Sequence, residues 1–400
     1  MSQPGVQCLC ALLFLPALAC ATSLQADGAG DEFLVNAGAT SAAAPDIGAA
    51  ADGSFVICWQ STPDTPAAFA QIAAKRFGAS TMALGDEFRV DSSATVGLDP
   101  AIAVDASGQF VVAWWHFDGF EIRGRRYAAD ASVTGPEFIA SNPPFAGLTQ
   151  IGNPAVADIF LDQFVVVWAG TTDFIRYDIA GRRIDSNGLP IGTGFVVNSA
   201  FAGNHGFAAV AADVAGNYVV AWHVGADILA RKFTSAGVFG PPFPVASGAS
   251  PGVALAADDA GNFVAVWPQN DTLLAQRFAG DTLPLGATFR IDQSGAASSP
   301  DVAMFADGGF VVAWQNSDGG FENSNVLARR FGADGSPAGD ELTVNVTTAG
   351  GQRDPAIATR SDGSFVVAWT SQAPLANETD VHARRMGSSD AIFSDGFDQE

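Results

Sequence analysis

The sequence has few cysteines and few basic residues, and it contains no hydrophobic run of transmembrane length. Its 400 residues include 4 Cys, of which Cys8, Cys10 and Cys20 precede the main body of the chain. Lys and Arg number 19 against 42 Asp and Glu, which gives a formal net charge of −23. A surface of this charge repels nucleic acid and anionic membranes. We therefore expect no nucleic-acid partner, no transmembrane segment and no disulfide framework.

The N-terminal segment has the features of a secretory leader. The apolar stretch from Cys8 to Ala21 is about 14 residues long, too short to span a bilayer and typical of a signal-peptide core. Ala19 and Ala21 supply small residues at the cleavage positions, so we expect cleavage after Ala21; lipidation of Cys20 is the alternative. This predicts a signal peptide over residues 1–21, a linker over 22–30, a repeat domain over 31–386 and a tail over 387–400.

An eight-residue pattern occurs seven times, from DGSFVICW at Asp52 to DGSFVVAW at Asp362. Each copy ends on Trp, and the copies are about 45–55 residues apart, a period typical of propeller blades. Both faces of this strand are apolar, which indicates burial on both faces. Cys58 occupies a position that is Ala or Val in the other copies, so we expect a buried apolar residue rather than a nucleophile. The tryptophans expected to pack between blades are Trp59, Trp114, Trp168, Trp222, Trp267, Trp314 and Trp369.

Each unit contains four predicted strands: an apolar run often opened by Pro, the octet, an ARRF-type strand and a DEFxV-type strand. The last unit stops after its third strand at Met386, and the segment DEFLVN over residues 31–36 is a fourth strand with no unit before it. Joining the two removes the free sheet edges. The sequence therefore predicts an all-β, seven-bladed β-propeller of four-stranded blades, closed by its N-terminal strand.

The succession DGxFVVAW, ARRF and GxEFxVN resembles a repeat of bacterial secreted and surface β-propeller proteins. The resemblance covers residues 31–386, and its motifs specify blade structure rather than chemistry. The tail AIFSDGFDQE, from Ala391, resembles a C-terminal ending of proteins exported by Gram-negative bacteria. These resemblances imply an extracellular propeller, secreted or held at the cell envelope, and we expect it to be a monomer.

The basic residues concentrate in a doublet of the third strand, which holds 13 of the 19 Lys and Arg. Four fourth strands offer an acidic partner, namely Glu32, Glu87, Glu137 and Glu341, and three offer none. Salt bridges therefore explain only part of the pattern, and contacts with aromatic rings or backbone carbonyls must contribute. We expect a structural role rather than an anion-binding ring for Arg76, Arg126, Arg183, Arg277, Arg330 and Arg385.

The loops that follow the octets and those that enter the first strands share one rim, and they vary most in length and content. The loop WWHFDGFE from Trp114 departs furthest from the repeat. Aromatic faces beside carboxylates are suited to a sugar ring or a peptide. The candidate ligand-binding residues are Trp115, His116, Phe117, Asp118, Phe120, Glu121, His205 and His223.

An aspartate follows every octet in these loops. A ring of carboxylates would suit Ca²⁺ or a cationic partner, although Asp is also a common turn residue and no EF-hand loop is present. The 4 His show no HxH or HExxH spacing, so no cofactor other than Ca²⁺ is expected. The candidate metal ligands are Asp64, Asp118, Asp173, Asp227, Asp271, Asp318 and Asp380.

Motifs that specify catalysis are absent from the sequence. It contains no GxSxG, no phosphate-binding glycine loop and no SxDxGxTW sialidase box, and a catalytic carboxylate pair cannot be chosen among 42 acids without geometry. The sequence predicts an exported, non-enzymatic binding module with a protein or glycan partner at the cell surface. Two alternatives stay open: an extracellular hydrolase or lyase acting on polysaccharide, and a calcium-stabilised surface protein.

Overall fold

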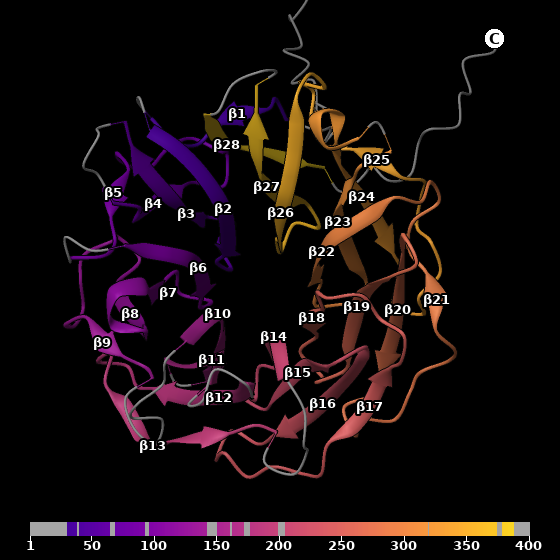
Figure 1. The fold of residues 1–400 in the computed structure, drawn as a ribbon, viewed down its shortest axis with the longest axis horizontal. Helices are drawn as coiled ribbons and strands as arrows, with labels where there is room; N and C mark the ends of the chain where they lie inside the picture. The colour runs from indigo at the N-terminus through magenta and orange to yellow at the C-terminus, as the bar shows by residue number, and fades with distance from the viewer. Residues whose placement is uncertain are drawn as a thin grey trace, which may run out of the picture.

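The computed structural model describes residues 30–37, 40–64, 69–92, 96–141, 150–160, 162–171, 177–198, 205–318, 320–373 and 378–387. Within these ranges the strands form seven four-stranded antiparallel sheets arranged in a ring (Figure 1). The predicted seven-bladed β-propeller is confirmed. The predicted signal peptide, the linker up to residue 29, the tail from residue 388 and Asp173 lie outside the described residues. No helix in the described part of the chain combines the length and the hydrophobicity needed to cross a bilayer.

The blades follow one another in chain order, with the first strand of each nearest the central axis (Figure 1). Blade 1 contains β2 (Thr40–Ala49), β3 (Phe55–Pro63), β4 (Gln71–Phe77) and β5 (Phe88–Arg89). Blade 2 contains β6 (Gly97–Val104), β7 (Phe110–His116), β8 (Glu121–Tyr127) and β9 (Phe138–Ile139), with the short 3-10 helix η1 (Phe117–Gly119). Blade 3 contains β10 (Gln150–Phe160), β11 (Gln163–Thr171), β12 (Tyr177–Ile184) and β13 (Pro190–Val196). Blade 4 contains β14 (His205–Ala212), β15 (Tyr218–Val224), β16 (Asp227–Phe233) and β17 (Phe243–Ala246).

The remaining three blades repeat this order. Blade 5 contains β18 (Ala254–Ala257), β19 (Phe263–Gln269), β20 (Thr272–Phe278) and β21 (Phe289–Arg290). Blade 6 contains β22 (Ala297–Met304), β23 (Phe310–Asn316), β24 (Asn325–Phe331) and β25 (Leu342–Thr343), with η2 (Phe321–Asn323). Blade 7 contains β26 (Gly351–Thr359), β27 (Phe365–Gln372), β28 (Thr379–Met386) and the N-terminal strand β1 (Phe33–Leu34).

The ring is closed by β1, which pairs with β28 in the register Phe33 to Ala383. The buried side chain of Asn36 reinforces this pairing, because its Oδ1 accepts the backbone N–H of Val381 at 2.8 Å. Glu32 accepts the backbone N–H groups of Val346 and Thr347, at the end of blade 6. The predicted closure by the N-terminal strand is therefore confirmed. The N-terminal segment contacts blade 7 through β1 and the end of blade 6 through Glu32.

The core consists of seven separate hydrophobic clusters, one at each interface between blades, rather than one central mass. Successive octet residues face opposite interfaces: Ile57 and Trp59 pack toward blade 7, while Val56 and Cys58 pack toward blade 2. Each interface receives one octet tryptophan, and all seven of these side chains are buried. A strand with two apolar faces is stable only between two sheets, which is why the octet recurs in every blade.

The octet follows a tight turn whose glycine adopts a left-handed backbone conformation. Gly53, for example, has φ of 80°, and its N–H is bonded to the carbonyl of Ala50. Only glycine enters this region without a steric cost from Cβ. Asp52 then accepts both the N–H and the hydroxyl of Ser54, which completes the DGS turn.

The basic doublets connect blades to their neighbours. In blade 6, Arg329 donates to the carbonyl of Ile291 in blade 5 at 2.9 Å, and Arg330 donates to the carbonyl of Gly363 in blade 7 at 3.0 Å. Arg330 also lies 4.2 Å from the ring centre of Phe305. Backward contacts of the same kind are made by Lys75, Arg125, Arg231 and Arg384. Forward contacts are made by Arg126, Arg183, Lys232 and Arg277.

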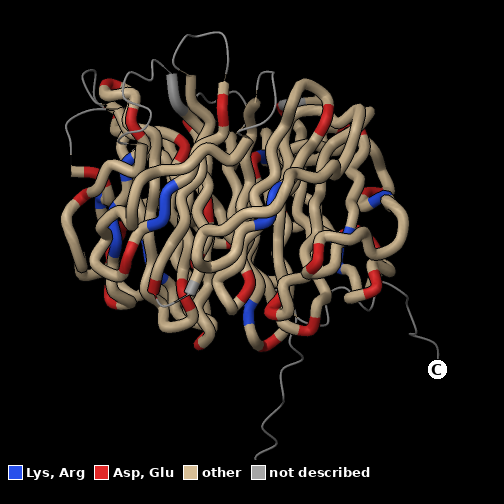
Figure 2. Tube along the Cα trace, turned by 90° about the horizontal axis from the view of Figure 1, so that it is seen from below, with Lys and Arg blue, Asp and Glu red and all other residues tan. Residues whose placement is uncertain are grey.

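The expected glutamate partners of the doublets bind mostly to backbone. Only Glu137 forms an ion pair with a doublet residue, at 3.2 Å from Arg125. Glu87 and Glu341 accept backbone N–H groups from the end of the preceding blade. Figure 2 shows acidic residues over both rims of the ring, and most Lys and Arg in the wall between them.

Candidate functional site

The first strand of six blades contains a bulge just before the position where proline usually stands. The residue at the bulge has a positive φ, for example 47° at Asp99, 51° at Asn153 and 50° at Phe207. A left-handed conformation costs a non-glycine residue about 1–2 kcal/mol, and such bulges turn side chains toward sites next to the sheet. The equivalent positions around the ring are Ala44, Asp99, Asn153, Phe207, Gly252, Ser299 and Asp354, and all seven line the mouth of the central channel.

A cavity of about 430 Å³ opens beside this channel mouth, across blades 2, 3 and 4. It shares Asp99, Asn153 and Phe207 with the channel wall. Its volume falls within the range of small-molecule sites, about 300–1,000 Å³. The described residues that line it are Asp99, Trp115, Gly152, Asn153, Ala169, Tyr177, His205, Gly206, Phe207, His223, Gly225 and Pro251.

His223 lies in the cavity wall with its imidazole 97% shielded from solvent, as its 3% exposure shows. The backbone of Gly225 hydrogen-bonds to this ring, and no other described residue offers its nitrogens a partner. Burial lowers its pKa, against a smaller opposite effect of the Gly225 backbone, so the imidazole is neutral at pH 7. A neutral imidazole with one nitrogen bonded to backbone leaves its other nitrogen for a ligand. His205, also buried, lines the same wall one strand away.

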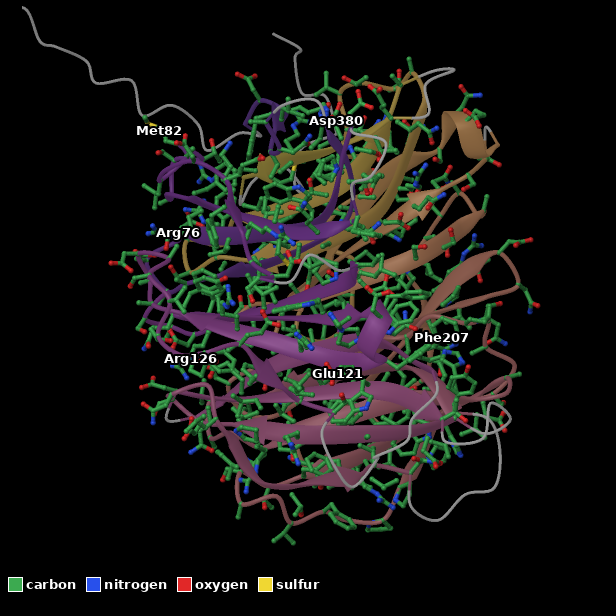
Figure 3. The ribbon with its side chains drawn as sticks, turned by 60° about the vertical axis from the view of Figure 1, so that its left-hand side comes forward. Arg76, Met82, Glu121, Arg126, Phe207 and Asp380 are labelled. Atoms are coloured by element: carbon green, nitrogen blue, oxygen red, sulfur yellow. The ribbon has the colours of Figure 1, made fainter. Side chains whose placement is uncertain are left out.

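Aromatic side chains form much of the remaining wall. Phe207 is 47% exposed and meets His223 edge-on, with ring centres 6.0 Å apart. Trp115 and Tyr177 contribute from β7 and β12. The indole N–H of Trp115 is buried without a hydrogen-bond partner in the described part of the chain. In Figure 3, Phe207 lies toward one side of the ring, while Arg76, Arg126 and Met82 lie toward the other.

The residues that the sequence predicted to bind a ligand fall into two groups in the structure. Trp115, His205 and His223 line the cavity, whereas the other five occupy the turn around η1 and β8. Phe117 and Phe120 are 44% and 39% exposed on that turn.

His116 belongs to the turn rather than to the cavity. It is buried at the end of β7, where its Nδ1 accepts the N–H of Gly119. Burial lowers the pKa of His116. Glu121 forms an ion pair with Arg123 at 2.7 Å, and Asp118 is exposed.

The aspartates that the sequence predicted as metal ligands do not lie close together. Asp64, Asp118, Asp227, Asp271 and Asp318 are exposed on their separate loops. Asp380 instead accepts a hydrogen bond from the Asn36 side chain at 2.9 Å. Among the described residues, no three His, Cys, Asp or Glu side chains lie close enough together to hold a metal ion.

The channel contains two further carboxylates that the sequence did not single out. Asp46 and Asp301 occupy equivalent positions two residues after the bulge in blades 1 and 6, where other blades have Ala. Each accepts two backbone N–H groups, one from its own strand and one from the next blade. Their place at the channel wall makes them structural links between first strands.

Asp99, Asn153, Tyr177 and Phe207 were missed as site residues. Three of them, Asp99, Asn153 and Phe207, occupy the bulge of the first strand, directly before the position that is usually proline. Residues before proline normally adopt extended conformations, so the sequence conceals the left-handed turn at Asp99 and Asn153. Tyr177 reaches the cavity only because β12 begins beside β14 of the next blade.

The fold and its channel-mouth cavity define the chain as a seven-bladed β-propeller, similar in structure to bacterial propellers. No family model matches the sequence, and no curated protein matches it significantly. A protein of unknown function from Dyadobacter fermentans superposes with a TM-score of 0.57 at 12% identity, covering 89% of this chain and 98% of that chain.

Two other solved structures belong to proteins that act on saccharides. Polysaccharide lyase Uly1 has a TM-score of 0.57 at 6% identity, covering 90% of this chain and all of that chain, 100%. The NanB sialidase from Streptococcus pneumoniae has a TM-score of 0.51 at 10% identity, covering 90% of this chain and 70% of that chain. At such identities the likeness shows the fold alone.

Proposed function

We propose that this chain is a binding propeller that holds one end or one unit of a glycan in the cavity across blades 2, 3 and 4. The observation that carries the proposal is His223, a buried imidazole in the cavity wall that bonds only to the backbone of Gly225 among the described residues. Leaving a buried polar group without a partner costs about 1–3 kcal/mol. A ligand that supplies the missing hydrogen bonds recovers that cost on binding.

Saccharides match this wall in two respects. Sugar hydroxyls both donate and accept hydrogen bonds, as the imidazole of His223 and the indole N–H of Trp115 require. The apolar faces of a sugar ring pack on aromatic side chains, and Phe207 presents such a face with 47% exposure. A peptide partner lacks this dense pattern of hydroxyls, so the glycan is the favoured partner.

The proposal is tested with residues 22–400 on a glycan microarray, followed by titration calorimetry on the glycans that bind. Phe207→Ala is expected to weaken binding about tenfold through loss of the aromatic face. Phe239→Ala is the matched control, because Phe239 is 49% exposed in the same blade, on the turn between β16 and β17 at the opposite rim. Absence of any glycan binding, or equal binding by both variants, would contradict the proposal.

An enzyme acting on polysaccharide is the second candidate. The observation that favours it is the convergence of a neutral imidazole at His223 with the phenol of Tyr177 and the carboxyl of Asp99 in one cavity. An imidazole near neutrality serves as a general base and a phenol as a general acid. New reducing ends released from a polysaccharide by the wild type, and not by His223→Asn, would replace the binding proposal with this one.

We further propose that the protein is exported as a monomeric member of the bacterial secreted propellers that its repeat resembles. The support is the apolar leader, the seven octets and the net charge of −23. N-terminal sequencing of the protein recovered from a Gram-negative host should begin at Thr22. A lipid-modified N-terminus at Cys20 would establish the alternative anchor, and retention of Met1 in the cytoplasm would refute export.

A further inference from the structure

The cavity wall carries a negative charge on the side chain of Asp99. Among the described residues that line the cavity, it is the one carboxylate, and no Lys or Arg accompanies it. The side chain stands where the cavity meets the channel, since Asp99 lines both. A ligand in the cavity therefore meets negative charge at this edge.

The carboxylate of Asp99 has no counter-charge among the described residues. No hydrogen bond or ion pair joins it to any described residue, in contrast to Asp354, the equivalent residue of blade 7, which lies 3.6 Å from Arg353. Burial raises the pKa of Asp99, and no cation of the described residues opposes this effect. A half-buried carboxylate without a partner is costly to keep ionised, and a cationic ligand group would offset that cost.

The aromatic residues beside Asp99 favour the same kind of ligand group. Trp115, Tyr177 and Phe207 line the cavity together with Asp99. The faces of aromatic rings attract cations, most strongly where water is excluded. The net charge of −23 also draws cationic ligands toward the surface.

We propose that the sugar held in this cavity carries a protonated amine, as in a hexosamine with a free amino group. This inference rests on the proposed glycan-binding function and names the chemical class of its ligand. The ammonium group pairs with the Asp99 carboxylate, and the sugar ring packs on Phe207 while its hydroxyls bond to His223. An acidic sugar is disfavoured, because its carboxylate would stand beside Asp99 without a compensating cation from the described wall.

The test compares three sets of oligosaccharides of equal length: glucosamine oligomers, their N-acetylated forms and neutral glucose oligomers. Titration calorimetry at pH 7 should show the free-amine oligomers binding at least tenfold more tightly than the other two. Asp99→Asn should remove this preference and leave binding of the neutral oligomers intact. Asn tolerates the left-handed conformation of the bulge, and Asn153 already occupies it in blade 3, so the substitution is compatible with the fold.

Asp354→Asn is the control, because Asp354 occupies the equivalent bulge and lines the channel but not the cavity. It should retain the preference for the free amine. Equal binding of amine and neutral oligomers would overturn this inference and leave the proposed function standing. Binding of none of the oligosaccharides would count against the proposed function itself. Binding of tetramethylammonium as tight as that of the amino sugar would overturn the saccharide part of the inference.

Discussion

Replacing Asp46 or Asp301 by Asn is expected to stabilise the propeller above neutral pH. Both carboxyl groups line the channel, and burial desolvates them. Asp46 accepts the N–H of Ile102 in the next blade at 2.7 Å, and Asp301 accepts that of Ile357 at 2.8 Å. These bonds link neighbouring first strands, but each link places a negative charge in a poorly solvated wall.

The size of the expected change in the free energy of unfolding follows from the pKa values of the two carboxyl groups. Burial raises the pKa of Asp46 from 3.8 to about 6. Burial, with the charge of Asp46, raises that of Asp301 from 3.8 to about 7. Because the folded-state pKa exceeds the unfolded one, the folded protein binds more protons between pH 4 and pH 7, and its free energy of unfolding falls as the pH rises through that window. For Asp46 the difference corresponds to about 3 kcal/mol, at about 1.36 kcal/mol per pKa unit.

Asn carries no charge at any pH but has one acceptor oxygen instead of two, which costs about 1 kcal/mol. The expected net gain for Asp46→Asn is therefore about 2 kcal/mol at pH 8, and below pH 4, where Asp46 is itself protonated, it should turn into a loss of about 1 kcal/mol. Urea unfolding of the wild type and both single variants from pH 4 to pH 8 measures this difference. The wild type and each variant share all other carboxylates, so the contributions of these groups cancel in the difference between the two free energies of unfolding. A gain that does not change with pH, or a variant less stable than the wild type at pH 8, would refute the reasoning.

Three further substitutions test the architecture. Trp222→Ala should lower the free energy of unfolding by about 3–5 kcal/mol, measured by urea unfolding, since its side chain fills the interface between blades 3 and 4. Arg126→Lys should lower the melting temperature without changing ligand affinity, because the guanidinium bonds to two backbone carbonyls of blade 3; altered affinity would contradict a structural role. Gly124→Ala should cost about 1–3 kcal/mol, since its new Cβ would stand 2.4 Å from the ring of Phe138. Gly240→Ala, where the new Cβ meets open space, should be neutral in the same thermal scan.

The basic doublets show where sequence reasoning on contacts succeeds and where it falls short. Their regular recurrence indicated a structural role, and the unequal supply of glutamates indicated that carbonyl groups also serve as partners. Glu32, Glu87 and Glu341 accept backbone N–H groups of the neighbouring blade. Glu32 also forms an ion pair with His382. The register between blades decides which partner each side chain reaches, and that register is not visible within one unit.

The cavity depends still more on the arrangement of the blades. Trp115, His205 and His223 were nominated because they interrupt the repeat, and they line one cavity. His116 interrupts the repeat equally but bonds within its own turn. Asp99 and Phe207 escaped notice because an ordinary-looking residue within the first strand gives no sign of its left-handed backbone.

The sequence by itself determined the number of blades, the doubly buried octet strand and the closure of the ring. It did so because each of these depends on alternation, spacing and a count of strands, which are properties of the chain read in order. The tertiary structure alone decided that Asp99, Phe207 and His223 face one cavity, that Asp46 and Asp301 link first strands, and that the doublets bond to carbonyls of both neighbours. These contacts join residues of different blades, and their geometry arises only when bulged strands converge on a common axis.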